Sequence, residues 1–492
     1  MRQVLKCCSF LLSLSLSAVA QIPNVDRPAH QRLMQWLAVF DGNNKEAYRT
    51  FFKEEFSSAM GRVDQDWGIR QHTGGFNLVK IQDESATKVT ALLQERLSDQ
   101  FAKIVLEVEA IEPQHLLKME IGPIELPAEF APPHLTEKEL TSALRERLKE
   151  VVTDDGYPPV GFGDGKSAHL FSGAVLVAKS GKSVFEEGYG LGGSEHSAPN
   201  TITTRFSIGS VNKMFTAVLI LQLVEAGKIK LDAPLGEYLH DYPNKDVASK
   251  VTIDQLLSHT GGTGDFFGPL FDRHRAELHS HQDYVKLFGD RPLRFEPGSR
   301  FEYSNYGFIL LGRVIEEITG EDYYDYVRAH VYVPADMTST GAPPIDEAIA
   351  HRTGSYQQMG SGEWTSAGGG YSTVGDLLRF ANALQDNKLL TAHSYNLMTT
   401  GKVDAPGVGQ YGYGVEVRTL NGSHCVGHSG GNRGINAELE VCPDSHYTVV
   451  VLANMNPPAA QKVSDFITNR LPLPTPDQGH PLFVRGLSTI RK

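Results

Sequence analysis

The chain has 492 residues, of which 40% are apolar and 21% are charged, and its formal net charge is −12 at pH 7. This composition is typical of a globular protein and excludes a wholly disordered, collagen-like or disulfide-dense chain. The length predicts two domains. The chain is acidic and has no Lys/Arg run, so we expect no nucleic-acid partner.

The first twenty residues, 1–20, are expected to be a signal peptide. Arg2 and Lys6 form a basic start, and an apolar, Ser-rich run too short to span a bilayer ends at an A-x-A cleavage site, residues 18–20. The alternative is a retained membrane anchor. We expect an exported protein, periplasmic or secreted, without a stable membrane span.

Residues 21–130 predict a small α+β domain. Apolar residues recur at helical spacing from Leu33 to Phe40 and from Ala47 to Phe56. Strand-like runs follow at 76–81, 88–97, 101–108 and 116–124. Two helices before such a meander loosely resemble the cone-shaped, cystatin-like fold of nuclear transport factor 2. This unit is a candidate ligand-binding unit, spacer or dimerisation module, and the last would make the protein a homo-oligomer.

A Pro-punctuated linker precedes the second predicted domain, residues 131–475, and residues 476–492 are expected to be a C-terminal tail. Thr136 and Glu139 form a capping box for a helix at the start of the second domain. Two predicted strands follow, at 173–178 and 183–189.

A Ser-x-x-Lys motif, Ser210 to Lys213, opens an apolar helical run that ends at Gly227. Lys213 lies one turn on, on the same helix face, and can reach the Ser210 hydroxyl. Serine is a poor nucleophile unless a base takes its proton. Lysine can be that base if its pKa is lowered by about 3 units, which burial beside another cation can do. The helix N-terminus would favour negative charge at Ser210.

Two further motifs lie downstream. Tyr303-Ser-Asn305 supplies a phenol that can ionise or shuttle protons, and an amide with both a donor and an acceptor. Residues 427–431, Gly-His-Ser-Gly-Gly, lie on one strand of a predicted hairpin. Gly430 and Gly431 lack side chains, so substrate can approach this strand, and a backbone N–H there can contribute to an oxyanion hole.

With these motifs in this order, residues 170–456 resemble the serine β-lactamase and penicillin-binding superfamily. The branch indicated holds class C β-lactamases, D-alanyl-D-alanine carboxypeptidases, D-aminopeptidases and family VIII carboxylesterases. Further matching stretches are residues 206–213, 255–262, 295–298 and 368–377. The resemblance implies an α+β, β-lactamase/transpeptidase-like fold. In that fold an antiparallel sheet flanked by helices stands beside a helical lobe, and the active site lies between them.

The resemblance also implies roles for individual residues. Ser210 would be the acylating nucleophile, Lys213 its base or proton partner, and Tyr303 the proton shuttle to the leaving group. Asn305 would contact substrate. The backbone N–H groups of Ser210 and Gly431 would form the oxyanion hole.

His428, Ser429 and Gly430 stand where the superfamily has Lys-Thr-Gly or His-x-Gly, in a substrate-binding position. His428 would help to position Tyr303 and bind a substrate carboxylate. Histidine near its ordinary pKa is mostly neutral at pH 7 and attracts a carboxylate less than an ammonium would. The departure from lysine favours the peptidase-like and esterase-like branches over an efficient β-lactamase.

Two patterns offer other interpretations. Residues 427–431 also match G-x-S-x-G, the nucleophile elbow of α/β-hydrolases, but that elbow needs a helix after it and a strand-like run follows here, at 435–441. The sequence His259-Thr-Gly261 also matches His-x-Gly. It follows a helical segment, 252–257, and is predicted to be a helix-end loop.

Only Cys425 and Cys442 remain after signal-peptide cleavage, and they flank the predicted hairpin with their midpoint inside its Gly-rich turn. Export permits a disulfide between them, and two buried free thiols are the alternative. The remaining His and Cys spacings match no zinc motif, so we expect no metal and no cofactor.

The sequence therefore predicts an exported serine hydrolase that forms an acyl-enzyme with an amide or ester substrate, either a small molecule or a peptide. A D-alanyl-D-alanine carboxypeptidase-like or D-aminopeptidase-like activity is the main expectation, with a family VIII-type carboxylesterase as the alternative and a class C-like β-lactamase less favoured. A non-catalytic binding protein that retains the pocket is a further alternative. The intact set of Ser210, Lys213 and Tyr303 argues against it.

Overall fold

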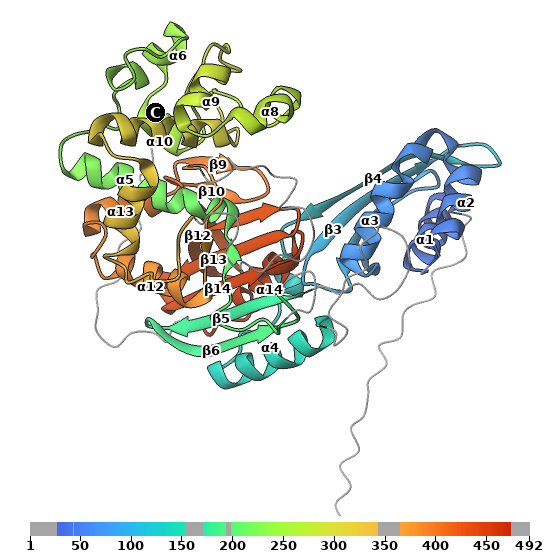
Figure 1. Ribbon diagram of the computed structural model, residues 1–492. Coiled ribbons are helices and arrows are strands. Elements are labelled where there is room, and N and C mark those ends of the chain that lie inside the picture. The colour runs from blue at the N-terminus through green and yellow to red at the C-terminus, as the bar shows by residue number, and fades with distance from the viewer. Residues whose placement is uncertain (1–26, 43, 153–170, 193–197, 343–364, 474–492) are drawn as a thin grey trace, which may run out of the picture.

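The computed structural model describes residues 27–42, 44–152, 171–192, 198–342 and 365–473. The predicted signal peptide and the predicted C-terminal tail lie outside the described residues. Figure 1 shows three groups of elements: blue N-terminal elements, a central sheet that runs from green to red, and a helical lobe beside that sheet. Within the described ranges, every helix is too short or too polar to cross a lipid bilayer.

The N-terminal elements form a four-stranded antiparallel sheet with helices packed on it (Figure 1). They are α1 (Pro28–Asp41), α2 (Lys45–Glu55), α3 (Val63–Thr73), β1 (Phe76–Glu84), β2 (Lys88–Glu95), β3 (Phe101–Val108) and β4 (Leu116–Ile124). The two predicted helices and four predicted strands are present. Helix α3 was not predicted, because its buried large apolar residues, Val63 and Trp67, form a single i, i+4 pair, which is too short a pattern to indicate a helix. A hydrophobic cluster of its own, which includes Trp36 and Phe52, holds this unit together.

The larger sheet has eight strands, all antiparallel, in the order β6-β5-β14-β13-β12-β11-β10-β9. Their bounds are β5 (Gly173–Lys179), β6 (Lys182–Tyr189), β9 (Val403–Ala405), β10 (Gly409–Tyr411), β11 (Glu416–Leu420), β12 (Ser423–Asn432), β13 (Ile435–Cys442) and β14 (Tyr447–Ala453). Side chains alternate between the two faces, so Val175 and Val177 pack into one hydrophobic cluster while Ala174 and Leu176 pack into another.

Helices cover both faces of this sheet. One face carries α4 (Glu137–Val151), which starts at the predicted capping box, and α14 (Ala459–Thr468). The other carries α12 (Val374–Gln385) and α5 (Asn212–Glu225), and α10 (Asn305–Thr319) packs against α5 in the helical lobe (Figure 1). Smaller elements are α6 (Lys245–Lys250), α7 (Ile253–Leu257), α8 (Pro269–His274), α9 (His281–Phe288), α11 (Tyr323–Val327), α13 (Ala392–Thr399), β7 (Phe206–Ser207) and β8 (Tyr371–Ser372). This α+β arrangement is the fold class expected from the resemblance.

Helix α14 and the turn after it contact the N-terminal unit. Lys462 Nζ lies 2.8 Å from Glu95 Oε2. Arg470 Nη2 donates to Asp99 Oδ1 at 3.0 Å. These four side chains are largely buried in the interface. The N-terminal unit is therefore held to the larger sheet by charged contacts with α14 and the turn after it.

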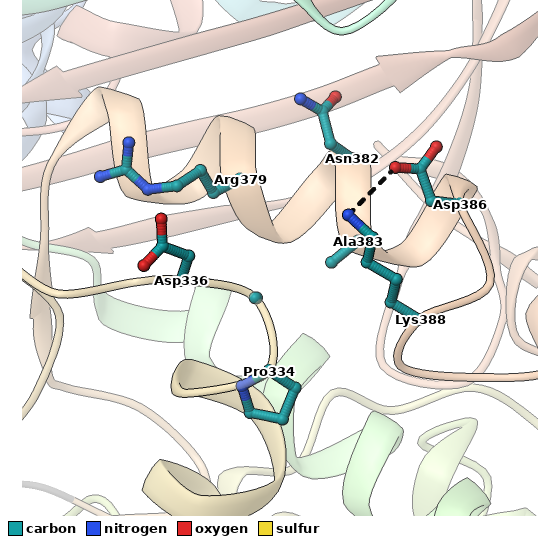
Figure 2. Close-up of a pocket in the computed structure, with 8 residues that line it drawn as sticks. Pro334, Asp336, Arg379, Asn382, Ala383, Asp386 and Lys388 are labelled. Carbon is teal, nitrogen blue, oxygen red and sulfur yellow. Dashed lines mark ion pairs between the residues drawn. The ribbon is translucent and has the colours of Figure 1, made fainter.

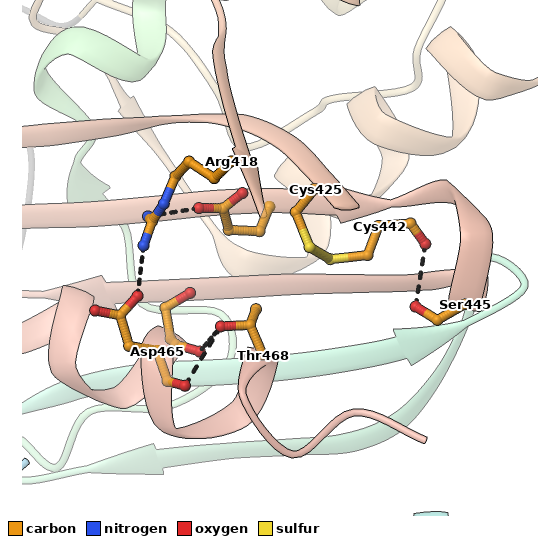
Figure 3. Close-up of a disulfide and its surroundings, with 8 residues drawn as sticks. Arg418, Cys425, Cys442, Ser445, Asp465 and Thr468 are labelled. Atoms are coloured by element: carbon orange, nitrogen blue, oxygen red, sulfur yellow. Dashed lines mark hydrogen bonds and ion pairs between the residues drawn. A yellow bond between two sulfur atoms is a disulfide. The ribbon is translucent and has the colours of Figure 1, made fainter. Parts of the chain in front are cut away.

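Cys425 on β12 and Cys442 on β13 form a disulfide, with their Cα atoms 4.1 Å apart. The strand register places the two residues opposite each other, as the predicted hairpin requires. Figure 3 shows this disulfide near Arg418, whose guanidinium lies 2.6 Å from Asp465 Oδ1. Both cysteines are fully buried. The disulfide therefore joins two central strands inside the protein.

Loss of the disulfide should destabilise the protein. The two cysteines are separated by 17 positions, so the chain-entropy contribution is about 3 kcal/mol. We expect the double variant Cys425→Ala/Cys442→Ala to lose about that much free energy of unfolding, measured by urea denaturation under oxidising conditions. As a control, wild type and variant are also measured with reductant, where neither has the disulfide. The difference in stability that remains there reports the packing lost with the two cysteine side chains. Equal stabilities under oxidising conditions would contradict the prediction.

The N-terminal unit should be dispensable for the chemistry, because the three motifs all lie beyond it in the chain. Leu135 N donates to Arg470 O, so the chain is already attached to the larger sheet at this point. We expect a protein that begins near Leu135 to be acylated at Ser210, as measured by labelling and intact mass. A truncated protein that has native circular dichroism but takes no label would show that the N-terminal unit contributes to the site.

Candidate active site

Ser210 lies in a short 3-10 turn, Gly209–Val211, that leads directly into α5. Gly209 has φ +52°, a left-handed conformation that glycine adopts without strain. One turn on, Lys213 Nζ lies 3.1 Å from Ser210 Oγ. The Lys213 side chain is fully buried. The contact expected from the Ser-x-x-Lys spacing is therefore present.

The amine of Lys213 has two further partners. Nζ donates to Asn305 Oδ1 at 2.7 Å and to the backbone carbonyl of Ala367. Burial lowers the pKa of Lys213 to about 7, against the opposing effect of the Asp265 carboxylate. Burial thus lowers the pKa of Lys213 without the cationic neighbour that was expected from the sequence. At neutral pH a large share of this amine is uncharged.

Asp265 orients the amide of Asn305. Asn305 Nδ2 donates to Asp265 Oδ2 at 2.9 Å, so the amide oxygen is the atom that faces Lys213. Asp265 lies in the loop between α7 and α8 and was not singled out in the sequence. A lone aspartate in a Gly/Phe-rich loop carries no signal of this contact, which only the fold creates.

The Tyr303 phenol is placed for proton transfer. It shares a hydrogen bond with Ser210, and Lys213 Nζ lies 4.8 Å from the centre of its ring. Burial raises the pKa of Tyr303 well above its ordinary value, against the effect of the Ser210 hydrogen bond. The phenol is therefore protonated at neutral pH, and of the two groups Lys213 is the one suited to accept a proton.

Strand β12 runs directly along the Ser210 turn. A Cβ atom at Gly430 would lie 2.0 Å from the carbonyl oxygen of Ile208 and 3.1 Å from Ser210 N, so only glycine fits there. A Cβ at Gly209 would likewise lie 3.1 Å from Gly431 N. The backbone N–H groups of Ser210 and Gly431, the predicted oxyanion-hole donors, therefore belong to closely packed segments.

The side chain of His428 is buried, and both its ring nitrogens have partners. Nε2 lies 2.8 Å from the Tyr411 hydroxyl, and Nδ1 lies 2.5 Å from the carbonyl oxygen of Ser429. A substrate carboxylate could bind His428 only by displacing one of them. The Ser429 hydroxyl, predicted to lie in the substrate-binding motif, donates to Glu416 Oε1 at 2.7 Å. That side chain is already engaged within the protein.

His259 is the histidine that contacts Tyr303. Its ring centre lies 4.3 Å from that of Tyr303, whereas the His428 ring lies 6.3 Å away. His259 does follow the end of α7, as predicted, but it is buried and its Nε2 lies 3.1 Å from the Tyr411 hydroxyl. The interpretation of His259 as only a helix-end loop residue is therefore incomplete. Residues 255–262, one of the stretches that resemble the superfamily, were the sequence signal that could have indicated a role for His259 in the site.

The nucleophile-elbow interpretation of Ser429 is wrong. Strand β12 continues past Ser429 to Asn432 and turns directly into β13. An elbow requires a helix immediately after the nucleophile. A second strand there leaves the Ser429 hydroxyl within the sheet, where it hydrogen-bonds to Glu416.

Figure 2 shows a pocket beside α12, and none of its lining residues belongs to the Ser210 cluster. Its lining residues are Pro334, Ala335, Asp336, Arg379, Asn382, Ala383, Asp386 and Lys388. Its charged groups pair locally, with Lys388 Nζ 3.5 Å from Asp386 Oδ2. In the described part of the chain, no group of three or more His, Cys, Asp or Glu residues could hold a metal ion.

Known proteins share these features. Residues 144–471 match the β-lactamase family model. Penicillin-binding protein 4* of Bacillus subtilis (strain 168) is 27% identical over 315 residues, which cover 58% of this chain and 68% of that protein. PbpX of the same organism is 29% identical over 255 residues, which cover 49% of this chain. The chain spans 62% of PbpX, less than two thirds of its length.

Solved structures agree with the sequence matches. The crystal structure of a penicillin-binding protein from Bacillus halodurans has a TM-score of 0.55 and 32% identity, over 60% of this chain and 95% of that one. The D-stereospecific amidohydrolase from a Streptomyces species has a TM-score of 0.50 and 28% identity, over 60% of this chain and 93% of that one. The chain therefore belongs to the β-lactamase family, within the serine β-lactamase and penicillin-binding superfamily.

Proposed function

We propose that the protein is exported and hydrolyses amide or ester bonds of D-amino-acid substrates through an acyl-enzyme on Ser210. The observation that carries the proposal is the set of partners around Lys213 Nζ. Asn305 Oδ1 and the Ala367 carbonyl can only accept hydrogen bonds, so they take both N–H groups of the neutral amine. The lone pair is then directed to the remaining partner, the Ser210 hydroxyl.

The reaction follows from this arrangement. Lys213 accepts the Ser210 proton as Oγ attacks the substrate carbonyl, and the N–H groups of Ser210 and Gly431 stabilise the oxyanion. Tyr303 gives its proton to the leaving group and regains one from the Lys213 ammonium. Water then attacks the acyl-enzyme and gives a proton to the neutral amine of Lys213, and the resulting ammonium returns that proton to Ser210 Oγ as the acyl bond breaks. Each step returns the site to its starting protonation state.

The third motif supports a D-aminopeptidase-like or amidase-like activity over a carboxypeptidase or a β-lactamase. Lysine in this position would offer an ammonium to a substrate carboxylate, whereas burial lowers the pKa of His428 and both its ring nitrogens have partners within the protein. The similar Streptomyces protein is a D-stereospecific amidohydrolase, which supports the same class. Export rests on the sequence pattern of residues 1–20. Formation of a homo-oligomer through the N-terminal unit is a further prediction from the sequence.

A family VIII-type carboxylesterase is the second candidate, because a neutral site also suits an uncharged ester. A panel of D-amino-acid amides, D-Ala-D-Ala peptides, p-nitrophenyl esters and nitrocefin separates the candidates. Highest kcat/KM on D-amino-acid amides would support the proposal. Turnover of simple esters alone would favour the esterase, and efficient nitrocefin hydrolysis would contradict both.

Replacement of the nucleophile should abolish the activity. We expect Ser210→Ala to lower kcat by roughly 10³- to 10⁶-fold, the range for a lost nucleophile, while circular dichroism is unchanged. Intact mass after fluorophosphonate treatment should show one adduct on wild type and none on the variant. Ser429→Ala is the matched control and should keep its adduct. A variant that retains more than a tenth of the wild-type rate would contradict the assignment.

Activity should depend on deprotonation of Lys213. Below its pKa of about 7 the amine carries a third proton and cannot accept one from Ser210, so kcat/KM for a neutral ester should rise with pH through about 7 and then level off. Lys213→Arg keeps the charge but cannot deprotonate, and we expect it to be as inactive as Lys213→Met. A flat wild-type profile from pH 5.5 to 8.5, or an active arginine variant, would show that Lys213 is not the base.

A further inference from the structure

A continuous chain of hydrogen bonds connects three buried side chains behind Tyr303. His259 Nε2 lies 3.1 Å from the Tyr411 hydroxyl, and that hydroxyl lies 2.8 Å from His428 Nε2. The three residues come from the loop after α7, from β10 and from β12. Each is at most 2% exposed. Water cannot readily satisfy these groups, so they must satisfy one another.

The outer partner of His259 fixes its proton. Ser304 N, a backbone donor, lies 3.1 Å from His259 Nδ1. A backbone N–H can only donate, so Nδ1 is the accepting nitrogen and carries no proton. The proton of the neutral ring is then on Nε2. His259 therefore donates to the oxygen of Tyr411.

The outer partner of His428 fixes the other end of the chain. The carbonyl oxygen of Ser429 can only accept, so His428 Nδ1 carries a proton and donates to it. Tyr411 already receives a hydrogen bond from His259, and its own hydrogen is directed to His428 Nε2. A neutral His428 satisfies every group in the chain. A protonated His428 would leave the Tyr411 hydrogen without its acceptor and would point two N–H groups at one oxygen.

Nearby charges act on His428 in opposite directions. Glu416 Oε1 lies 3.8 Å from Nδ1 and favours the cation. Burial is the largest effect and lowers the pKa of His428, Lys213 adds to this lowering, and the hydrogen bond to Ser429 opposes it. Burial likewise lowers the pKa of His259 well below its ordinary value. The directed hydrogen bonds and the burial thus both favour a neutral His428, whereas the Glu416 carboxylate favours the protonated ring.

We propose that His259 and Tyr411 are positioning residues that hold His428 as its neutral Nδ1–H tautomer, so that the third motif selects against substrates bearing a carboxylate. Neither residue needs to touch substrate for this effect. In addition, the His259 ring packs against the Tyr303 ring and keeps its phenol beside Ser210. The selectivity part of this inference rests on the proposed hydrolase function, whereas the tautomer does not.

The tautomer is tested first, by NMR of the full-length protein labelled with ¹³C,¹⁵N-histidine. The resonances of His428 are assigned by their loss in His428→Gln. We expect wild-type His428 to remain neutral, with the proton on Nδ1, from pH 5.5 to 8. A protonated ring or an Nε2–H tautomer at pH 7 would overturn the proposal, whatever the activity of the enzyme.

The role of Tyr411 is tested by Tyr411→Phe. Loss of one hydrogen bond to the neutral ring should raise the pKa of His428 by about one unit, which makes the protonated fraction about tenfold larger at a given pH. Tyr306→Phe is the matched control: it removes a buried hydroxyl on α10 that is bonded to Tyr242 and lies outside this chain of hydrogen bonds. Unchanged titration of His428 in Tyr411→Phe would overturn the proposal.

Selectivity is measured as the ratio of kcat/KM for p-nitrophenyl hemisuccinate to that for p-nitrophenyl butyrate. The two esters share a leaving group and differ in the carboxylate. We expect Tyr411→Phe to raise this ratio several-fold at pH 5.5 and less at pH 7.5, with the Tyr306→Phe ratio as in wild type. Loss of both activities in equal proportion would refute a role in selectivity. If wild type cleaves neither ester and no D-amino-acid amide while His428 remains the neutral Nδ1–H tautomer, the proposed function fails and the positioning role stands.

Discussion

The buried amine of Lys213 imposes the main constraint on the site. An unpaired ammonium is costly to bury, and a neutral amine is buried at low cost only if its hydrogens find acceptors. Asn305 Oδ1 and the Ala367 carbonyl provide two, from the start of α10 and from the segment before β8. Three segments far apart in the sequence must therefore converge on one nitrogen. The proposed reactivity of Ser210 depends on this convergence.

The start of α10 organises most of the polar contacts around that amine. The Ser304 hydroxyl caps the helix by accepting from Gly307 N at 2.9 Å, while the Ser304 N–H fixes the tautomer of His259. The next residue, Asn305, bridges Lys213 and Asp265. One helix end thus orients the proposed base, Lys213, through the Asn305 amide and the proposed proton shuttle, Tyr303, through the His259 ring. A change at this cap would disturb both groups.

Helix α14 joins the oxyanion strand to the N-terminal unit, and its position does not depend on that unit. Asn436 donates to the carbonyl of Gly430 at 3.1 Å and accepts from Ala460 N at 2.7 Å. The pair of Arg418 and Asp465 and the buried apolar face of α14 hold the helix to the sheet. Without the N-terminal unit, Lys462 and the other cations of the interface would be exposed to water, where an unpaired charge costs little.

The sequence predicted the four N-terminal strands, β5, β6 and the hairpin of β12 and β13, because each depends on local alternation and turn residues. It indicated the three motifs through short spacings along the chain. It also indicated the cysteine pairing, which needs only the register of one hairpin. His259, Asp265 and Tyr411 have no such local signature, because their roles come from contacts between separate loops and strands. The expected roles of His428 and Ser429 changed for the same reason. A strand position alone does not show which partners occupy a ring nitrogen or a hydroxyl, and here those partners, Tyr411 and Glu416, decide what each residue can offer to substrate.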